Sequence, residues 1–316
     1  MRKVVDIEPT RDVDELVRRM EESGGFVAKK VGVGVDILEK MVKDEESLNF
    51  LSFPACIIAT GTRGIIRELV RRKLFDVVIT TCGMLDHDLA RIWKDYYHGS
   101  FLMDDEELRK RGINRLGNVL VPDESYGIIL EDKLQPILKE IWEEGKRELA
   151  TYELVWEIGK RLREEEKKEE SIIYWAYKNE VPVVIPGPMD GAVGSQIWLF
   201  SQDHDFKVDV IKDEKFLSSL VFDAKRSGAL MIGGGISKHH VIWWNQFKGG
   251  LDYAVYITTA PEWDGSLSGA RLREAVSWGK VKGKAKYITI EGDATVLLPL
   301  MISSLLSRLG SSTSGF

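Results

Sequence analysis

The segment D-Y-A-V-Y-I-T-T-A-P-E-W-D-G-S-L-S-G-A-R-L-R-E-A-V-S-W-G-K, Asp252–Lys280, is the most informative stretch of the chain. It begins with an apolar run typical of a buried strand and continues through a Gly/Ser-rich loop. It ends at a lysine that follows Trp278 and Gly279. A lysine beside an indole is a candidate nucleophile, because desolvation disfavours the charged amine and only the neutral amine attacks a carbonyl or imine. Most lysines are solvated surface charges, so this position needs support from the rest of the chain.

Similar short runs, nearly continuous in Val, Ile, Tyr or Ala, alternate with amphipathic stretches along the whole sequence. Such runs are expected where helices cover both faces of a parallel sheet. We therefore predict an α/β fold with a doubly wound, mostly parallel, Rossmann-like sheet and helices on both faces. The predicted strands are Ala55–Thr60, Asp76–Thr81, Val181–Ile185, Ala229–Ile232, Tyr253–Thr258 and Tyr287–Ile290, and the predicted helices are Asp12–Ser23, Val35–Glu46, Gly64–Lys73, Asp132–Glu144, Tyr152–Arg163, Ile172–Asn179 and Asp213–Ser227.

The composition is that of a globular protein, with 316 residues, 44% hydrophobic and 30% charged. We predict one domain over residues 1–310, with N-terminal helices within about residues 10–50 packed on the sheet, and a flexible tail at 311–316. The mixed-charge run Glu164–Glu170 is interpreted as a solvated helix end or loop rather than an interaction tail. No run reaches the ~18 apolar residues of a membrane span, and the first residues lack a secretion signal.

Charge and cysteine content narrow the partners and the compartment. The formal net charge of −6 disfavours nucleic acid as a partner and suits a cationic small molecule or a basic protein surface. Cys56 and Cys82 lie in apolar surroundings, which argues against a disulfide framework or a zinc site. We therefore expect a cytoplasmic protein.

In an open parallel sheet, ligands bind beyond the carboxyl ends of the strands. Loops rich in glycine and polar residues follow several predicted strands at this edge. They are Thr81–Gly83, Pro186–Gly194, Gly233–His240, Thr259–Ser268 and Gly292–Ala294. The prediction is a ligand site formed by these loops.

The triplet Gly233–Gly235 permits close approach of backbone to a bulky ligand, and its N–H groups suit a pyrophosphate at a helix start. It does not fit G-x-G-x-x-G, so from these residues alone a tight strand-to-helix turn is favoured over dinucleotide binding. His239 and His240 are adjacent and would point about 100° apart on a helix, so they cannot chelate one metal in tandem. No metal site is predicted. One of these histidines could exchange a proton near neutral pH, and capping of a helix start is an equal alternative.

Several blocks of sequence together resemble one known family, deoxyhypusine synthase. They occur in family order from about Phe53 to Leu305, which is most of the chain. The blocks are G-I-N-R-L-G-N-V-L-V-P at Gly112–Pro122, M-D-G-A-V-G at Met189–Gly194, M-I-G-G-G-I-S-K-H-H at Met231–His240, E-A-V-S-W-G-K at Glu274–Lys280 and the turn Gly292–Ala294.

The resemblance implies roles for individual residues. Lys280 matches the family's catalytic lysine, and His239 is favoured as the histidine facing the polyamine. Substrate contacts are implied for Glu274, Trp278, Tyr256 and Ser195. NAD contacts are implied for Thr81, Gly83, Asp190, Gly233, Gly234, Gly235, Thr259, Ala260, Asp264, Ser268, Asp293 and Ala294.

The match departs from eukaryotic members at positions that anchor spermidine. Ser195 and Leu267 stand where those members carry aspartates, and Trp243 replaces an asparagine. Removing a buried partner of a charged amine costs on the order of 2–5 kcal/mol unless another group compensates. Two explanations stay open: archaeal-type members bind the polyamine differently, or the donor is another polyamine. His87 also stands where the family usually has a glutamate, and we assign it no role.

The resemblance implies an archaeal-type deoxyhypusine synthase. Such an enzyme uses NAD to move the aminobutyl group of spermidine, through an imine on Lys280, to a lysine of the hypusine-containing translation initiation factor five-A. A homotetramer with sites at dimer interfaces is also implied. Two alternatives stay open: homospermidine synthase, in which a free diamine is the acceptor, and a catalytically idle NAD-binding scaffold.

Overall fold

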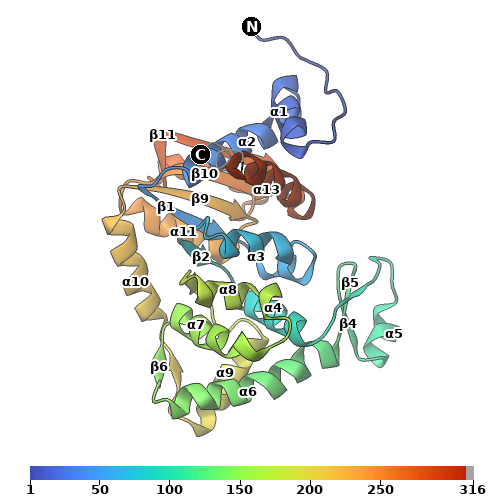
Figure 1. Cartoon of the computed structure of the whole chain (residues 1–316), viewed down its shortest axis with the longest axis vertical. Helices are drawn as coiled ribbons and strands as arrows, with labels where there is room; N and C mark the ends of the chain where they lie inside the picture. The colour runs from blue at the N-terminus through green and yellow to red at the C-terminus, as the bar shows by residue number, and fades with distance from the viewer. Residues whose placement is uncertain (311–316) are drawn as a thin grey trace. The chain divides into compact units, whose positions relative to one another are not determined.

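The computed structural model describes residues 1–310 and confirms the predicted α/β fold (Figure 1). Contacts within the chain group it into two compact units. Unit 1 comprises Met1–Phe53, Leu74–Asp76 and Leu217–Phe316, and unit 2 comprises Pro54–Lys73 and Val77–Phe216. The prediction of a single domain over 1–310 stays a prediction, and the tail predicted at 311–316 lies outside the described residues.

Unit 1 contains four parallel strands in the order β11-β10-β9-β1. The strands are β1 (Ser47–Ser52), β9 (Arg226–Ile232), β10 (Leu251–Thr258) and β11 (Val281–Glu291). Helix α11 (Gly235–Gln246) connects β9 to β10, and α12 (Leu272–Ser277) connects β10 to β11. These are βαβ units, so the carboxyl ends of β9, β10 and β11 share one edge.

Helices cover both faces of this sheet, as neighbouring residues of β10 demonstrate. Tyr256 faces α11, because the Lys238 ammonium lies 3.8 Å from its ring centroid. Val255 faces the other side, toward helix α2 (Phe26–Val42). A Cβ placed on Gly34 of this helix would lie 3.6 Å from Val255 Cγ1. Consecutive strand residues point to opposite faces, so the two helices pack on opposite sides. The second face carries α1 (Val13–Ser23), α2 and α13 (Ala294–Gly310), which lie together (Figure 1).

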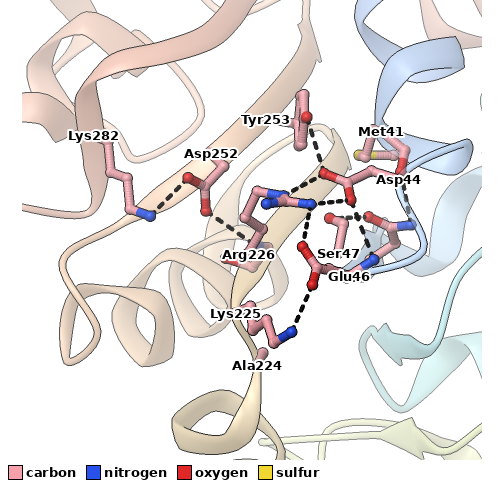
Figure 2. A network of polar contacts seen from close by, with 12 residues as sticks. Met41, Asp44, Glu46, Ser47, Ala224, Lys225, Arg226, Asp252, Tyr253 and Lys282 are labelled. Carbon is pink, nitrogen blue, oxygen red and sulfur yellow. Dashed lines mark hydrogen bonds and ion pairs between the residues drawn. The ribbon is translucent and has the colours of Figure 1, made fainter.

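A polar network joins the amino ends of these strands (Figure 2). The Arg226 guanidinium donates to both carboxylate oxygens of Asp44, at 2.5 and 2.6 Å, and to Glu46. The Tyr253 hydroxyl donates to Asp44 at 3.0 Å. Arg226 begins β9, Tyr253 lies near the start of β10, and Asp44 precedes β1. The network therefore joins three segments that are far apart in sequence.

Unit 2 contains the parallel pair β2 (Val77–Ile79) and β7 (Val183–Val184) and the short parallel pair β6 (Glu148–Leu149) and β8 (Lys207–Val208). It also has an antiparallel sheet of β3 (Tyr97–His98), β5 (Val119–Pro122) and β4 (Ile113–Leu116), which the sequence analysis missed. Its helices are α3 (Arg63–Arg71), α4 (Gly83–Trp93), α5 (Asp105–Lys110), α6 (Gly127–Glu143), α7 (Thr151–Arg161), α8 (Ile172–Lys178) and α9 (Ala192–Asp203); α10 (Val210–Asp223) contributes residues to both units.

One predicted strand is wrong. Ala55–Thr60 forms a 3₁₀ helix over Ala55–Ala59, and the strand of that region is β1, Ser47–Ser52. A short apolar run does not distinguish a buried helical turn from a strand. The strand β1 was not predicted because it contains polar residues. Asn49 is nevertheless buried there, since its side chain accepts from Ser47 Oγ at 2.8 Å and donates to the Met41 carbonyl at 3.3 Å.

Other predictions differ mainly at their boundaries. Helix α10 ends at Asp223, and the last residues predicted for it begin β9. The second N-terminal helix starts earlier than predicted, at Phe26. The charged run Glu164–Glu170 is a loop with two short 3₁₀ turns, as expected. Among residues 1–310, no helix is both long and apolar enough to cross a membrane.

Candidate functional site

Three loops of unit 1 meet at the carboxyl edge of its sheet. Gly233–Gly235 follows β9, Thr259–Arg271 follows β10, and Gly292–Asp293 follows β11. Adjacent parallel strands end at one edge, so the predicted cofactor residues of these loops share one region of unit 1.

Two physical causes, backbone conformation and close packing, explain the glycines of the triplet. Gly233 and Gly235 have φ of 64° and 70°, in the left-handed region that favours glycine. Gly234 lies against Ser268, and a Cβ there would be 2.2 Å from the Ser268 Oγ. Packing of two loops therefore explains Gly234. Gly235 has open space in front of it and begins α11, so the backbone there is accessible to a ligand.

Asp264 organises the loop after β10 and remains exposed. Its Oδ1 accepts from the Ser266 N–H and hydroxyl, both at 2.7 Å. These bonds lower the pKa of Asp264 below its usual value, so the carboxylate is charged at neutral pH. An exposed carboxylate of this kind can accept bonds from hydroxyl groups of a ligand.

Other predicted cofactor residues take more ordinary positions. Asp293 Oδ1 accepts from the Thr295 N–H at 2.7 Å at the start of α13, which is a helix-capping contact next to Ala294. Thr259 is exposed. The Ala260 N–H donates to Thr258 Oγ1, which holds the beginning of the loop.

Lys280 lies at the opposite, amino edge of the sheet, directly before β11. Gly279, with φ of 68°, turns the chain out of α12, and the Lys280 carbonyl accepts from the Leu251 N–H at 3.0 Å. Lys280 is 8% exposed, and its Nζ lies 5.2 and 5.7 Å from the ring centroids of Trp278 and Trp243. The predicted dry, indole-lined position of this amine is therefore present.

A pocket of about 320 Å³ extends from this lysine toward the loop after β10. Residues of α11 and α12 form its walls, and four predicted site residues line it together: His239, Glu274, Trp278 and Lys280. The other lining residues are Lys238, Ile242, Trp243, Leu267, Ala270, Arg271, Leu272 and Ala275. A pocket with two lysine amines, one imidazole and one carboxylate suits a flexible amine substrate.

His239 and Glu274 bring different chemistry to this pocket. Burial, followed by the charges of Lys280, His240 and Lys238, lowers the pKa of His239, so its imidazole is neutral at pH 7. The His239 ring stacks on Trp243 with centroids 5.6 Å apart. Glu274 is exposed and is the carboxylate among the lining residues. It can pair with a protonated amine.

The departures from the family also line this pocket. Trp243 and Leu267 both contribute apolar surface to it. At these two positions the pocket wall is therefore apolar. Tyr256 is fully buried beneath Lys238, and its hydroxyl donates to the Ser268 carbonyl at 2.6 Å. It supports the loop from below and is not among the lining residues.

Unit 2 places its predicted residues around the start of α9. Thr81 Oγ1 accepts from the Ala55 N–H at 3.2 Å, and Gly83 begins α4. A Cβ on Gly191 would meet Asp86 Oδ2 at 2.7 Å, which explains the glycine in M-D-G-A-V-G. Asp190 and Ser195 are exposed on either side of it.

Sequence reasoning missed Asp86, which is 1% exposed. Its carboxylate accepts from the N–H groups of Ala192 and Val193, at 2.9 and 2.8 Å, and from the Tyr126 hydroxyl at 2.7 Å. Burial raises its pKa above the usual value. Sequence reasoning also missed Lys238, a nearly fully buried lysine of the pocket wall. No local pattern signals either residue, because their partners lie far away in the sequence.

Comparison with known proteins identifies the family of the chain. The family model described as deoxyhypusine synthase matches residues 15–305. A protein of Picrophilus torridus named "Probable deoxyhypusine synthase" is 57% identical over 305 residues, covering 96% of both chains. A protein of the same name from Thermoplasma acidophilum is 53% identical over 308 residues, covering 96% of this chain and 97% of its own.

A solved structure from Entamoeba histolytica, of a protein placed in the same family, has a TM-score of 0.64 and 21% identity, and covers 96% of both chains. At this identity the likeness concerns the fold. The family model and the relatives each span nearly the whole chain. The chain therefore belongs to the deoxyhypusine synthase family.

Proposed function

We propose that this chain is an NAD-dependent aminobutyl transferase that takes the aminobutyl group of spermidine and delivers it to a lysine of translation initiation factor five-A. The observation that carries the proposal is the pocket in unit 1, where buried Lys280 shares walls with His239, Glu274 and two tryptophans. An amine nucleophile, a neutral imidazole and a carboxylate are the groups that imine exchange on a polyamine requires.

The residues at the carboxyl edge of unit 1 fit NAD. Gly235 opens α11 with free space before it, which suits a pyrophosphate, and the ionised Asp264 suits ribose hydroxyls. Gly233, Gly234, Thr259, Ala260, Ser268, Asp293 and Ala294 complete the proposed set in unit 1. For Thr81, Gly83 and Asp190, which belong to unit 2, NAD contacts stay predictions from the family resemblance. When bound, NAD would supply reversible hydride transfer: it would accept a hydride from the amine-bearing carbon of the donor and return it to the imine formed on the acceptor lysine.

Lys280 performs the covalent step. Its Nζ attacks the imine carbon of the oxidised donor and forms a new C–N bond. The old C–N bond then breaks, and the diaminopropane portion leaves as an amine with the proton. The aminobutyl group stays on Lys280 as an imine until the amine of the acceptor lysine attacks the same carbon and releases Lys280 unchanged.

His239 and Glu274 serve this exchange. The neutral imidazole of His239 takes the proton from the attacking amine and returns it to the departing one. Glu274 pairs with the terminal ammonium of the donor, and the indoles of Trp278 and Trp243 replace the hydration of its charge and methylenes. For Ser195, exposed in the first turn of α9 in unit 2, a substrate contact stays a prediction from the family resemblance.

The test has two stages. The protein is first mixed with NAD and spermidine, and NADH absorbance is followed; we expect a stoichiometric rise. No rise with any of several polyamines would leave an NAD-binding scaffold as the better interpretation. Labelled spermidine is then supplied with either the factor or putrescine. Label on the factor supports the proposal, and label only on putrescine identifies a homospermidine synthase.

A cytoplasmic homotetramer, in which residues of two chains complete each site, is part of the same proposal. Three basic side chains of one chain, those of Lys238, Arg271 and Lys280, share the pocket with a single carboxylate, so a tricationic donor needs further acidic partners. Analytical ultracentrifugation should give about four times the chain mass. A monomer that is fully active would contradict this part.

A further inference from the structure

Lys238 is a lysine of α11 that lies almost completely inside unit 1, with 2% exposure. Its Nζ donates to the carbonyl oxygens of Leu267 and Ala270, at 2.7 and 2.6 Å. The same Nζ lies 3.8 Å from the ring centroid of Tyr256. Two carbonyls and an aromatic face therefore surround one amine, and none of these partners is a neighbour in sequence.

In the loop after β10, consecutive backbone carbonyls accept hydrogen bonds from side chains of unit 1. Lys238 binds those of Leu267 and Ala270, and between them the Ser268 carbonyl accepts from the hydroxyls of Tyr256 and Thr258, at 2.6 and 2.9 Å. The remaining carbonyl, of Gly269, accepts from the Arg271 guanidinium at 2.9 Å. Every backbone acceptor from 267 to 270 is thus held from within the unit.

Burying an ammonium here is costly, and an apolar side chain of similar volume would avoid that cost. The charged groups around Lys238 do not compensate fully: Glu274 favours its charge, whereas Arg271 and Lys280 oppose it. Burial outweighs the other influences and lowers the pKa of Lys238 to about 7. The stability of the core therefore does not explain why a lysine occupies this position.

We propose that Lys238 is a positioning residue, which fixes the loop Thr259–Arg271 by two carbonyls and thereby places Asp264 and Ser268 for the cofactor and Leu267 for the donor. The inference rests on the proposed function. Leu267 lines the pocket and Ser268 lies against Gly234, so a shift of this loop changes both ends of the site together.

The test compares Lys238→Met with wild type by hydrogen exchange and by calorimetry with NAD. We expect faster exchange confined to peptides of residues 259–271 and NAD affinity reduced at least about tenfold, while exchange in β9 and β10 is unchanged. Unchanged loop exchange would overturn the proposal. So would an increase spread evenly over unit 1, because that would make Lys238 a general stabilising residue.

Two further variants complete the design. Lys248→Met is the matched control, since Lys248 also lies in unit 1, donates to one carbonyl, that of Ala224, and is not among the pocket residues; it should leave loop exchange and NAD affinity as in wild type. Lys238→Ala with added propylamine tests the amine itself. Restored NAD affinity with propylamine, but not with propanol, supports the proposal, and equal effects of both additives contradict it.

Loop exchange is measured without ligands, so it tests Lys238 even if wild type shows no reaction with spermidine. If Lys238→Met does not fold, Tyr256→Phe removes one bond to the Ser268 carbonyl and should raise loop exchange in the same peptides, by a smaller factor. No change in that variant would then overturn the proposal.

Discussion

At the scale of residues, the position of Lys280 shows how the chain encloses a type of side chain that is usually solvated. The turn at Gly279 and the pairing of the Lys280 carbonyl with Leu251 fix the backbone, and two indoles enclose the side chain. The amine therefore lies at a defined place in the pocket before any ligand binds, which reduces the ordering that the reaction requires.

Lys280→Arg should abolish transfer to the factor, because a guanidinium stays protonated and has no free amine to form an imine. NAD affinity should remain within a few-fold of wild type, since Lys280 lies at the amino edge of the sheet. Transfer is measured by label on the factor and NAD binding by calorimetry. Lys282→Arg is the control, because Lys282 is paired with Asp252 at 2.7 Å and should tolerate the change. Transfer by Lys280→Arg at the wild-type rate would falsify the nucleophile assignment.

Asp264→Ala should weaken NAD binding by about tenfold or more, because an exposed carboxylate that accepts hydroxyl bonds is lost. Spermidine binding should change less, since Asp264 is not among the pocket residues. Asp264→Asn keeps an acceptor for Ser266 without the charge, so its NAD affinity should lie between those of wild type and Asp264→Ala. Calorimetry with each ligand decides, and a larger loss for spermidine than for NAD would reject the role.

At the scale of elements, helix α9 shows a start that is held from a distance. Its first N–H groups are satisfied by Asp86 of α4 rather than by a residue just before the helix. A buried carboxylate that accepts three bonds is difficult to replace, because removal leaves several donors without partners.

Asp86→Ala should lower the free energy of unfolding by about 2–3 kcal/mol, since buried donors lose their acceptor. Asp12→Ala is the matched control. Asp12 is an exposed cap that accepts from the Glu15 N–H at 2.8 Å, and its loss should cost about 1 kcal/mol or less. Urea unfolding at pH 7 measures both. Equal losses in the two variants would show that burial of Asp86 adds nothing.

At the scale of the whole molecule, the network at the amino edge of unit 1 joins residues 182 positions apart, Asp44 and Arg226. The Arg226 guanidinium, together with the Glu46 N–H and the Tyr253 hydroxyl, lowers the pKa of Asp44 to about 2 from 3.8 (Figure 2). A carboxyl whose pKa is lowered by folding stabilises the fold above its unfolded pKa, and this contribution disappears as pH falls from 3.8 to 2.

Asp44→Asn should therefore reduce the free energy of unfolding at pH 7 by about 1–2 kcal/mol, a value discounted because Arg226 is 39% exposed. The difference from wild type should shrink as pH falls below 3.8. Urea unfolding at several pH values between 7 and 3 checks this. Glu46→Gln, in a more exposed pair, should cost less than Asp44→Asn. A difference that is constant with pH would mean that the charge of Asp44 is not responsible.

The sequence by itself determined the α/β class, most of the strands and the identity of the nucleophile candidate. Periodicity and short motifs such as E-A-V-S-W-G-K depend on neighbouring residues, which are visible in one dimension. It did not reveal that Ala55–Ala59 is helical, because a short apolar run has no period of its own.

Only the tertiary structure decided which side chains share the pocket and which support it from behind. Lys280 and Leu267 line one cavity, although they belong to opposite edges of the sheet, while Tyr256 turned inward to hold a loop. Lys238 and Asp86 owe their environments to groups that are distant in sequence. Burial and pairing of polar groups result from packing of remote segments, and a linear pattern carries no record of such packing.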